Sequence, residues 1–165
     1  MRERSVITYQ WNLIYIVEWF SENLIYILGD DPFPLPVEGQ HSLELLDNSF
    51  ISELDNDSDF DEWFDIKQNW EFKHSWFLNR AGSFLPVVLF RRVNDEIEIA
   101  WSNGSTYSSH GVSFINPTGV KYISFRKFEL IITNFIKDFL GNLMLTSKNK
   151  SDAIKFRQKI INLIK

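Results

Sequence analysis

The stretch from about residue 87 to 101 constrains the fold most, because two alternating apolar segments there flank Asn94 and Asp95. A two-residue Asn-Asp connection between such segments predicts a β-hairpin. With this turn, Arg91 stands opposite Glu98 across the two strands, where opposite charges stabilise a cross-strand pair. The hairpin is therefore the expected basis of a small antiparallel sheet.

Alternation along the hairpin predicts one apolar face and one polar face. The apolar face is expected to carry Val88, Phe90, Ile97, Ile99 and Trp101, with Arg92 at its edge. The polar face is expected to carry Arg91, Glu96 and Glu98. Such a pattern is typical of an antiparallel pair that packs one face on the core and leaves the other in water. The charged groups would then lie outside the core.

Helical periodicity predicts three long helices and a further one near the C-terminal end. Their expected ranges are 8–28, 60–80, 125–144 and 151–165. In the second of these, one face is expected to carry Trp63, Ile66, Trp70, His74 and Phe77. Packed on the hairpin, three to four helices predict a single α+β domain over residues 1–165.

Shorter elements complete this scheme. A helical turn is expected at 42–46, and short strands are expected at 112–115 and 120–123. After the first helix, Asp31-Pro-Phe-Pro-Leu-Pro alternates three prolines, which stiffens the backbone and excludes a helix. Phe33 and Leu35 are expected to anchor this strap on the core. The alternative is that the strap is an exposed, extended ligand for a partner.

Charge is unevenly distributed along this chain of net charge −5. An acidic loop is expected at about 48–60, and the acidic segment 53–65 contains no base. Among its acids are Asp55, Asp57, Asp59 and Asp61. The basic C-terminal helix at about 151–165, together with the residues from Lys148, carries six bases against one acid. The net acidity argues against nucleic acid as the main partner, because phosphate contacts dominate that affinity.

No metal or cofactor is expected from the motifs. The Asp-rich run at 55–59 is similar to the start of a calcium loop, but Phe60 and Ile66 stand where that loop needs Gly and Glu. The chain contains no cysteine and no HExxH motif. A restriction-type nuclease strand needs a Glu-x-Lys triplet, and Ala100 follows Glu98 at the position of the lysine. Nucleophile-elbow and glycine-rich phosphate motifs are also absent.

No membrane span is expected either. The apolar stretch 11–28 contains Glu18 and Glu22, which would be costly inside a bilayer. Because these acids are four residues apart, they share one face of an amphipathic helix. A chain without cysteine is compatible with a reducing compartment, and we expect a cytoplasmic location.

A few residues remain as candidates for a binding site. His74 stands among aromatic side chains, where it is either a hydrogen-bonded core histidine or part of a pocket shared with Arg80, Arg91 or an acid such as Glu71. Pairing with Glu98 accounts for Arg91. The hairpin gives Arg92 no partner, so Arg92 is the best candidate for contact with another molecule.

Several of these residues belong to one longer pattern. It consists of Trp70, His74-Ser75, a glycine-and-proline turn at 79–86, an Arg91-Arg92 strand and a Glu-Ile-Ala-Trp strand at 98–101. This pattern resembles a segment of uncharacterised multi-domain bacterial proteins, some with an IrrE-type metallopeptidase and some tied to phage defence. The region of Trp19 and the Asp-Pro-Phe-Pro strap is similar to their upstream part.

The resemblance implies an accessory or sensing module, since no HExxH motif follows the pattern in this chain. The candidate binding residues that the resemblance implies are His74, Arg91, Arg92, Glu98 and Trp101. The leading hypothesis is a non-catalytic subunit or regulator of a bacterial defence or toxin-regulating system that binds another protein. One alternative is an immunity-type inhibitor that uses the acidic segment 53–65. Another is a divergent metal-dependent hydrolase that uses Glu96, Glu98 and His74.

Overall fold

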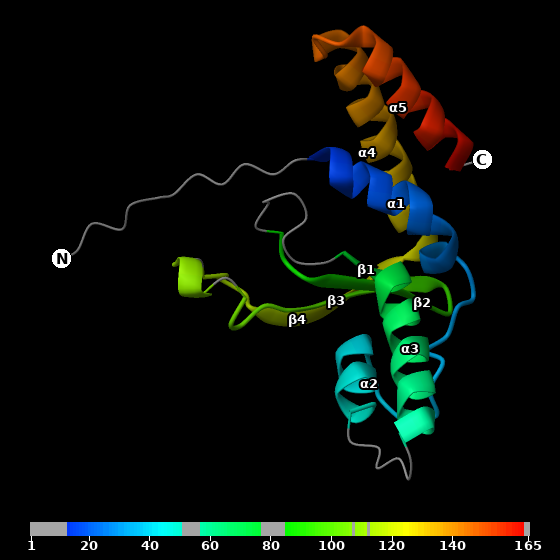
Figure 1. Cartoon of the computed structure of the whole chain (residues 1–165), viewed down its shortest axis with the longest axis vertical. Coiled ribbons are helices and arrows are strands. Elements are labelled where there is room, and N and C mark those ends of the chain that lie inside the picture. Colours follow the sequence, from blue (N-terminus) through cyan, green and yellow to red (C-terminus); the bar gives the residue numbers. More distant parts are fainter. Residues whose placement is uncertain (1–12, 51–56, 77–84, 107, 112, 164–165) are drawn as a thin grey trace, which may run out of the picture.

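The structure is a computed structural model that describes residues 13–50, 57–76, 85–106, 108–111 and 113–163. At its centre is a four-stranded antiparallel sheet in the order β1-β2-β3-β4 (Figure 1). The strands are β1 (Ser75–Trp76), β2 (Val88–Val93), β3 (Glu96–Ser102) and β4 (Thr118–Ser124). A short 3-10 turn, η2 (Ser108–His110), lies between β3 and β4. With the helices described below, this sheet confirms the predicted α+β class.

The predicted hairpin is formed by β2 and β3. Arg91 pairs with Glu98 and Val93 with Glu96, in the register that the sequence predicts. At the turn, Asn94 has a φ of 55°, a left-handed conformation that asparagine tolerates better than most residues. The register of the β2–β3 hairpin is therefore set by the chemistry of one short turn.

Helices cover both faces of the sheet (Figure 1). On one face lie α1 (Leu13–Leu28) and α4 (Phe125–Thr146), and α5 (Lys150–Leu163) packs against these two helices. On the other face lie α2 (Ser42–Asn48) and α3 (Asp57–His74). The prediction that the polar face lies in water is therefore wrong for Arg91 and Glu98, which α2 and α3 cover, whereas Glu96 at the end of β3 is exposed as predicted.

The core under α1 and α4 consists mainly of aromatic rings. Trp19 and Phe20 of α1 meet Trp76 and Phe90 of the sheet, and Phe128 of α4 closes the cluster. Phe20 packs edge-on against Trp76 and Phe90, with ring centroids 5.2 and 5.3 Å away. Edge-to-face contacts of this kind add to the free energy of burial. This cluster joins α1 and α4 to the hairpin.

The second helical face carries a smaller cluster. Trp70 of α3 packs with Leu89 and Ala100 of the sheet, and Phe33 of the strap meets the Trp70 ring edge-on at 5.0 Å. Leu35 is also buried, so both residues of the strap pack inward as predicted. The strap therefore holds α3 against the sheet.

Helix α3 differs from its prediction in two respects. It ends at His74 rather than at residue 80, because Ser75 and Trp76 pair with β2 as the edge strand β1. Ile66 was expected on the buried face but is exposed, while Lys67 is buried. The Lys67 ammonium lies 3.1 Å from the centre of the Phe50 ring, a cation–π contact that offsets the cost of burial.

The remaining elements agree with the sequence in outline. The predicted strand at 120–123 is part of β4, whereas the described part of 112–115 is not a strand. Ser124 precedes α4, but its side chain makes no capping hydrogen bond. In α5, the Lys159 ammonium contacts the Glu18 carboxylate and lies 3.2 Å from Glu22 Oε1, which holds α5 to α1. Within the described ranges, no helix is long and apolar enough to cross a bilayer.

Candidate functional site

The most unusual feature of the described structure is a buried carboxylate in the middle of the sheet. Glu98 of β3 has 0% of its surface exposed. Its side chain lies on the face that α2 and α3 cover, together with Arg91 of β2 and Tyr122 of β4. A buried charge of this kind is stable only when hydrogen bonds and an opposite charge replace water.

One carboxylate oxygen of Glu98 binds the start of α2. Both the backbone N–H and the hydroxyl of Ser42 donate to Oε1, the former at 2.8 Å. The first N–H groups of a helix have no partner within the helix, and a negative charge suits this end of the helix dipole. Glu98 therefore holds α2 on the sheet, even though 56 residues separate it from Ser42.

The other carboxylate oxygen binds the two neighbouring strands. Arg91 Nη2 donates to Glu98 Oε2 at 2.8 Å, and the Tyr122 hydroxyl donates to the same oxygen at 3.2 Å. Burial and the adjacent Glu98 charge raise the pKa of Tyr122, so this hydroxyl keeps its proton at neutral pH. Both oxygens of Glu98 are thus engaged within the protein.

His74 lies on the same side of the sheet and is also fully buried. Its ring stacks on Trp70, with centroids 4.1 Å apart and planes 14° apart. Nδ1 lies 2.9 Å from the Trp70 carbonyl oxygen, which can only accept, so Nδ1 carries a proton. Within the described residues Nε2 has no hydrogen-bond partner, and Asp31 Oδ2 is 3.8 Å from it.

Burial is the main cause that lowers the pKa of His74 below its ordinary value of 6.5. The Trp70 carbonyl and Asp31 act in the opposite direction, while Lys73 and Arg91 lower the pKa further. His74 is therefore neutral at pH 7. A neutral, stacked and enclosed imidazole is typical of a histidine that stabilises the core.

Arg92 projects from the opposite face of the hairpin, where it joins three elements. Its guanidinium donates to the carbonyl oxygens of Asn94 at 2.9 Å and of Leu28 at 3.0 Å. It also lies 4.5 Å from the centre of the Phe125 ring. Arg92 thus connects the turn, the end of α1 and the start of α4.

Trp101 also makes structural contacts. Its indole N–H donates to the Asn116 carbonyl at 2.9 Å. Its ring covers Gly119 so closely that a Cβ atom at that glycine would lie 2.4 Å from the ring. The structure therefore brings His74, Arg91 and Glu98 to one covered face, and places Arg92 and Trp101 on the other side of the sheet.

The other candidate residues are less fully described. Arg80 and Asp55 lie outside the described residues, and so do residues 51–56 of the predicted acidic loop. Asp57 and Asp59 belong to the first turn of α3, and Asp61 is exposed on the same helix. Among the described side chains, no group of three or more His, Cys, Asp or Glu is placed to hold a metal ion.

Sequence reasoning missed two of the three partners of Glu98. Ser42 was expected only in a helical turn, and nothing in its local sequence indicates a contact with β3. Tyr122 lies in the strand predicted at 120–123. The sequence did not show that this strand pairs with β3, and this pairing is what places Tyr122 beside Glu98. Arg91, the third partner, was found because turn chemistry alone sets the hairpin register.

Comparison of the chain with protein-family models, with curated proteins and with solved structures finds no match.

Proposed function

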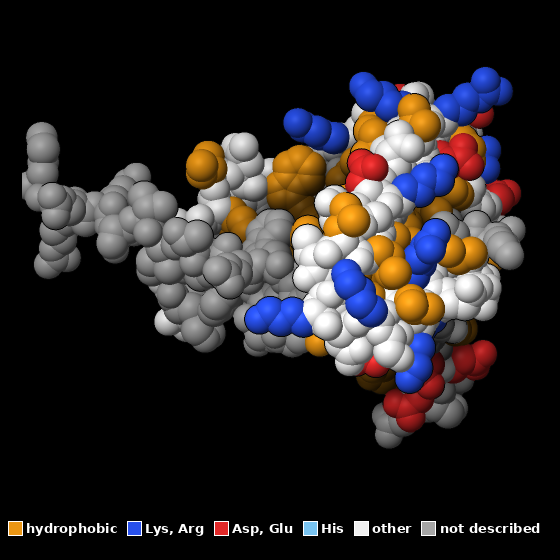
Figure 2. Space-filling model, turned by 90° about the horizontal axis from the view of Figure 1, so that it is seen from above, with side chains coloured by type: hydrophobic (Ala, Val, Ile, Leu, Met, Phe, Trp, Pro, Cys, Tyr) orange, Lys and Arg blue, Asp and Glu red, His pale blue; other side chains and the backbone are white. Residues whose placement is uncertain are grey.

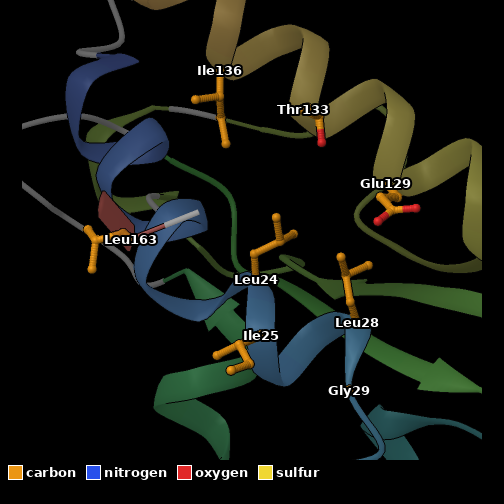
Figure 3. Close-up of a pocket in the computed structure, with 8 residues that line it drawn as sticks. All are labelled: Leu24, Ile25, Leu28, Gly29, Glu129, Thr133, Ile136 and Leu163. Carbon is orange, nitrogen blue, oxygen red and sulfur yellow. The ribbon is translucent and has the colours of Figure 1, made fainter. Parts of the chain in front are cut away.

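We propose that this protein is a non-catalytic interaction module that acts as a subunit or regulator by binding another protein. The main support is an apolar pocket of about 410 Å³ between α1, α4 and the end of α5 (Figure 3). Leu24 and Leu28 of α1 extend into it opposite Ile136 of α4. Exposed apolar surface of this kind commonly marks a protein–protein contact.

The rim of this pocket indicates the chemistry of the partner. Ile25, at the edge, is 74% exposed, and Leu163 of α5 is also exposed. Among the described residues that line the pocket, Glu129 of α4 is the one carboxylate. We therefore expect the partner to insert an apolar side chain between α1 and α4 and to place a basic group beside Glu129.

The buried polar groups support a non-catalytic role. Glu98 accepts four hydrogen bonds from within the chain, the one from Arg91 being also an ion pair, and helices cover it. A general base or metal ligand needs a free lone pair within reach of the substrate. The setting in a bacterial defence or toxin-regulating system rests on the sequence resemblance alone.

The proposal is tested by placing a photo-crosslinking amino acid at Ile25 in cells of the source organism. We expect a covalent adduct with another protein, whose crosslinked peptide is apolar with an adjacent Lys or Arg. The matched control places the crosslinker at Lys121, an exposed position on β4 away from the pocket. Equal labelling from both positions, or none from position 25, would contradict the proposal.

The non-catalytic part has its own test. Glu98→Gln should reduce stability and leave the Ile25 adduct in place whenever the variant is folded. Hydrolysis by the purified protein with Mg²⁺ or Mn²⁺, lost in a folded Glu98→Gln variant, would instead support the divergent hydrolase.

A second candidate function is the immunity-type inhibitor, and the surface of α3 favours it. Phe60 and Phe64 are exposed and stacked beside the exposed acids Asp61 and Asp65. Acids with exposed rings fit a basic partner surface. This function predicts binding that weakens steeply with salt and is lost when Asp55, Asp57 and Asp59 become asparagine.

A further inference from the structure

The helical hairpin formed by α4 and α5 projects away from the sheet (Figure 1). A groove lies between these two helices. The groove has a volume of about 570 Å³. Its lining residues are Lys137, Leu140, Gly141 and Met144 of α4, and Arg157 and Ile161 of α5. It is distinct from the pocket beside Ile25, with which it shares no lining residue.

Gly141 is the first indication that something docks in this groove. It stands inside the 22-residue helix α4, where glycine costs about 1 kcal/mol relative to alanine. Apart from the neighbouring backbone of α4 itself, a Cβ atom at this position would meet no heavy atom of the described chain within 4 Å. Packing within the protein therefore does not require a glycine there. The missing side chain would allow the backbone of another helix to approach closely.

Charge is the second indication. Residues 125–163 contain eight Lys and Arg against three Asp and Glu, although the whole chain has a net charge of −5. Figure 2 looks onto this end of the molecule and shows basic side chains distributed around hydrophobic ones. The groove lining contains Lys137 and Arg157 and, among the described residues, no carboxylate. Its occupant should therefore be an acidic helix with exposed apolar side chains.

The first half of α3 has this chemistry. Phe60 is 54% and Phe64 40% exposed, with the two rings stacked at 6.3 Å. Asp61, Glu62 and Asp65 are exposed beside them. The start of α3 and the α4–α5 groove lie at opposite ends of the long axis of the molecule (Figure 1). A chain cannot place this helix in its own groove, but a second copy can.

We propose that two copies of this chain pair in antiparallel orientation, each placing the first half of its α3 in the α4–α5 groove of the other. Phe60 and Phe64 cover the gap above Gly141, and Asp61 and Asp65 face Lys137 and Arg157. Because the two surfaces lie at opposite ends, an antiparallel pair makes both contacts at once, and assembly stops at two copies.

Sedimentation velocity of the full chain over a concentration series tests this pairing. We expect a monomer–dimer equilibrium that weakens as salt is raised. Lys137→Glu with Arg157→Glu should raise the dissociation constant at least about a hundredfold, because like charges then face each other. The matched control, Lys127→Glu with Lys155→Glu, makes the same charge change on exposed positions of the same helices outside the groove. It should leave most of the dimer intact.

A mixing experiment tests which two surfaces meet. Gly141→Trp should fill the groove without distorting α4, since the Cβ position is free. Phe60→Ser with Phe64→Ser should remove the inserted rings, which are exposed in the single chain. Each variant alone should be monomeric. Their mixture should form a dimer, because one intact groove and one intact α3 remain in the mixed pair. Circular dichroism verifies that each variant is folded.

Several outcomes would overturn the pairing. These are a wild-type chain that stays monomeric, a dimer that persists in the groove variants, or equal losses in the groove and control charge variants. A monomer that binds phosphatidylglycerol vesicles through Lys137 and Arg157 would assign the groove to a lipid surface instead. If the dimer forms, it covers the acidic end of α3, so that surface is then not free for the inhibitor function. The contact at Ile25 does not depend on either result.

Discussion

Helices cover the centre of the β2–β3 hairpin on both faces, but they bury the two faces in different ways. Under α1 and α4, Phe90 packs among the rings of Trp19, Phe20, Trp76 and Phe128, with no charge in the cluster. Under α2 and α3, by contrast, a carboxylate joins three strands to the start of a helix. Truncating a side chain in an apolar cluster lowers the unfolding free energy in proportion to the volume removed. Removing either partner of a buried ion pair leaves the other as an unpaired buried charge, which costs more than the pair itself contributes.

The largest effects should come from the centres of these two faces. Glu98→Ala leaves Arg91 and the Ser42 N–H without their partner and should cost about 3–5 kcal/mol of unfolding free energy. Phe90→Ala should cost about 3–5 kcal/mol by opening a cavity. Urea denaturation at neutral pH measures both.

A compensating second substitution tests whether the unpaired charge explains the loss of stability at Glu98. Arg91→Met added to Glu98→Leu should recover a large part of the loss of the single Glu98→Leu variant, because no unpaired charge then remains. If the double variant is as unstable as Glu98→Leu, the ion pair is not what distinguishes this face.

Two glycines provide the next comparison. Gly119→Ala places a Cβ atom against the Trp101 ring at 2.4 Å and should destabilise by about 1–3 kcal/mol. Gly141→Ala should stabilise by about 0.5–1 kcal/mol, because its Cβ position is free and alanine favours helices. Thermal unfolding of both variants in dilute solution should shift the melting temperature in opposite directions. Shifts in the same direction would contradict the conclusion that the Cβ position is blocked at Gly119 and free at Gly141.

Arg92 should contribute less. Arg92→Met removes two hydrogen bonds to carbonyl oxygens and the contact with Phe125 while it keeps much of the side-chain volume. We expect a loss of about 1 kcal/mol in urea denaturation. If Arg92→Met keeps full stability but loses the Ile25 adduct, Arg92 would be a partner contact as the sequence first indicated.

The smallest effect at neutral pH should come from the titration of His74, because its contribution to the unfolding free energy changes only in acid. Because burial lowers its pKa, the unfolded chain binds a proton below about pH 6.5 that the folded chain does not. This contribution is therefore complete above about pH 6.5 and is lost as the pH falls toward the lowered folded pKa. His74→Phe should reduce the loss of stability between pH 7 and pH 5, measured by urea denaturation.

Asp31 provides the matched control for that experiment. Its carboxylate raises the pKa of His74, so Asp31→Asn should make the loss of stability in acid steeper. An unchanged acid dependence in both variants would show that His74 does not titrate differently in the folded chain.

The sequence predicted best what short-range chemistry determines. The Asn94-Asp95 turn specifies the register, so the pairing of Arg91 with Glu98 could be predicted and is confirmed. Helical periodicity likewise identified the helices to within a few residues where they are described. The end of α3 was wrong because Ser75 and Trp76 join the sheet, and no local signal competes with helical periodicity there.

What covers the hairpin could not be predicted. Alternation identifies two faces but does not reveal whether a second layer covers the polar one. That layer consists of α2, α3 and the strap, and it joins the sheet through Ser42 and Trp70, far from β3 in sequence. The burial of Glu98 and His74 is therefore a property of tertiary packing.

The bond from Glu98 to the first turn of α2 has a consequence for the order in which the chain becomes structured. A helix of seven residues is too short to persist alone in water. Its amide hydrogens should therefore exchange with solvent together with those of the hairpin, as one cooperative unit. The strand that bears Glu98 would have to be in place before residues 42–48 could remain helical.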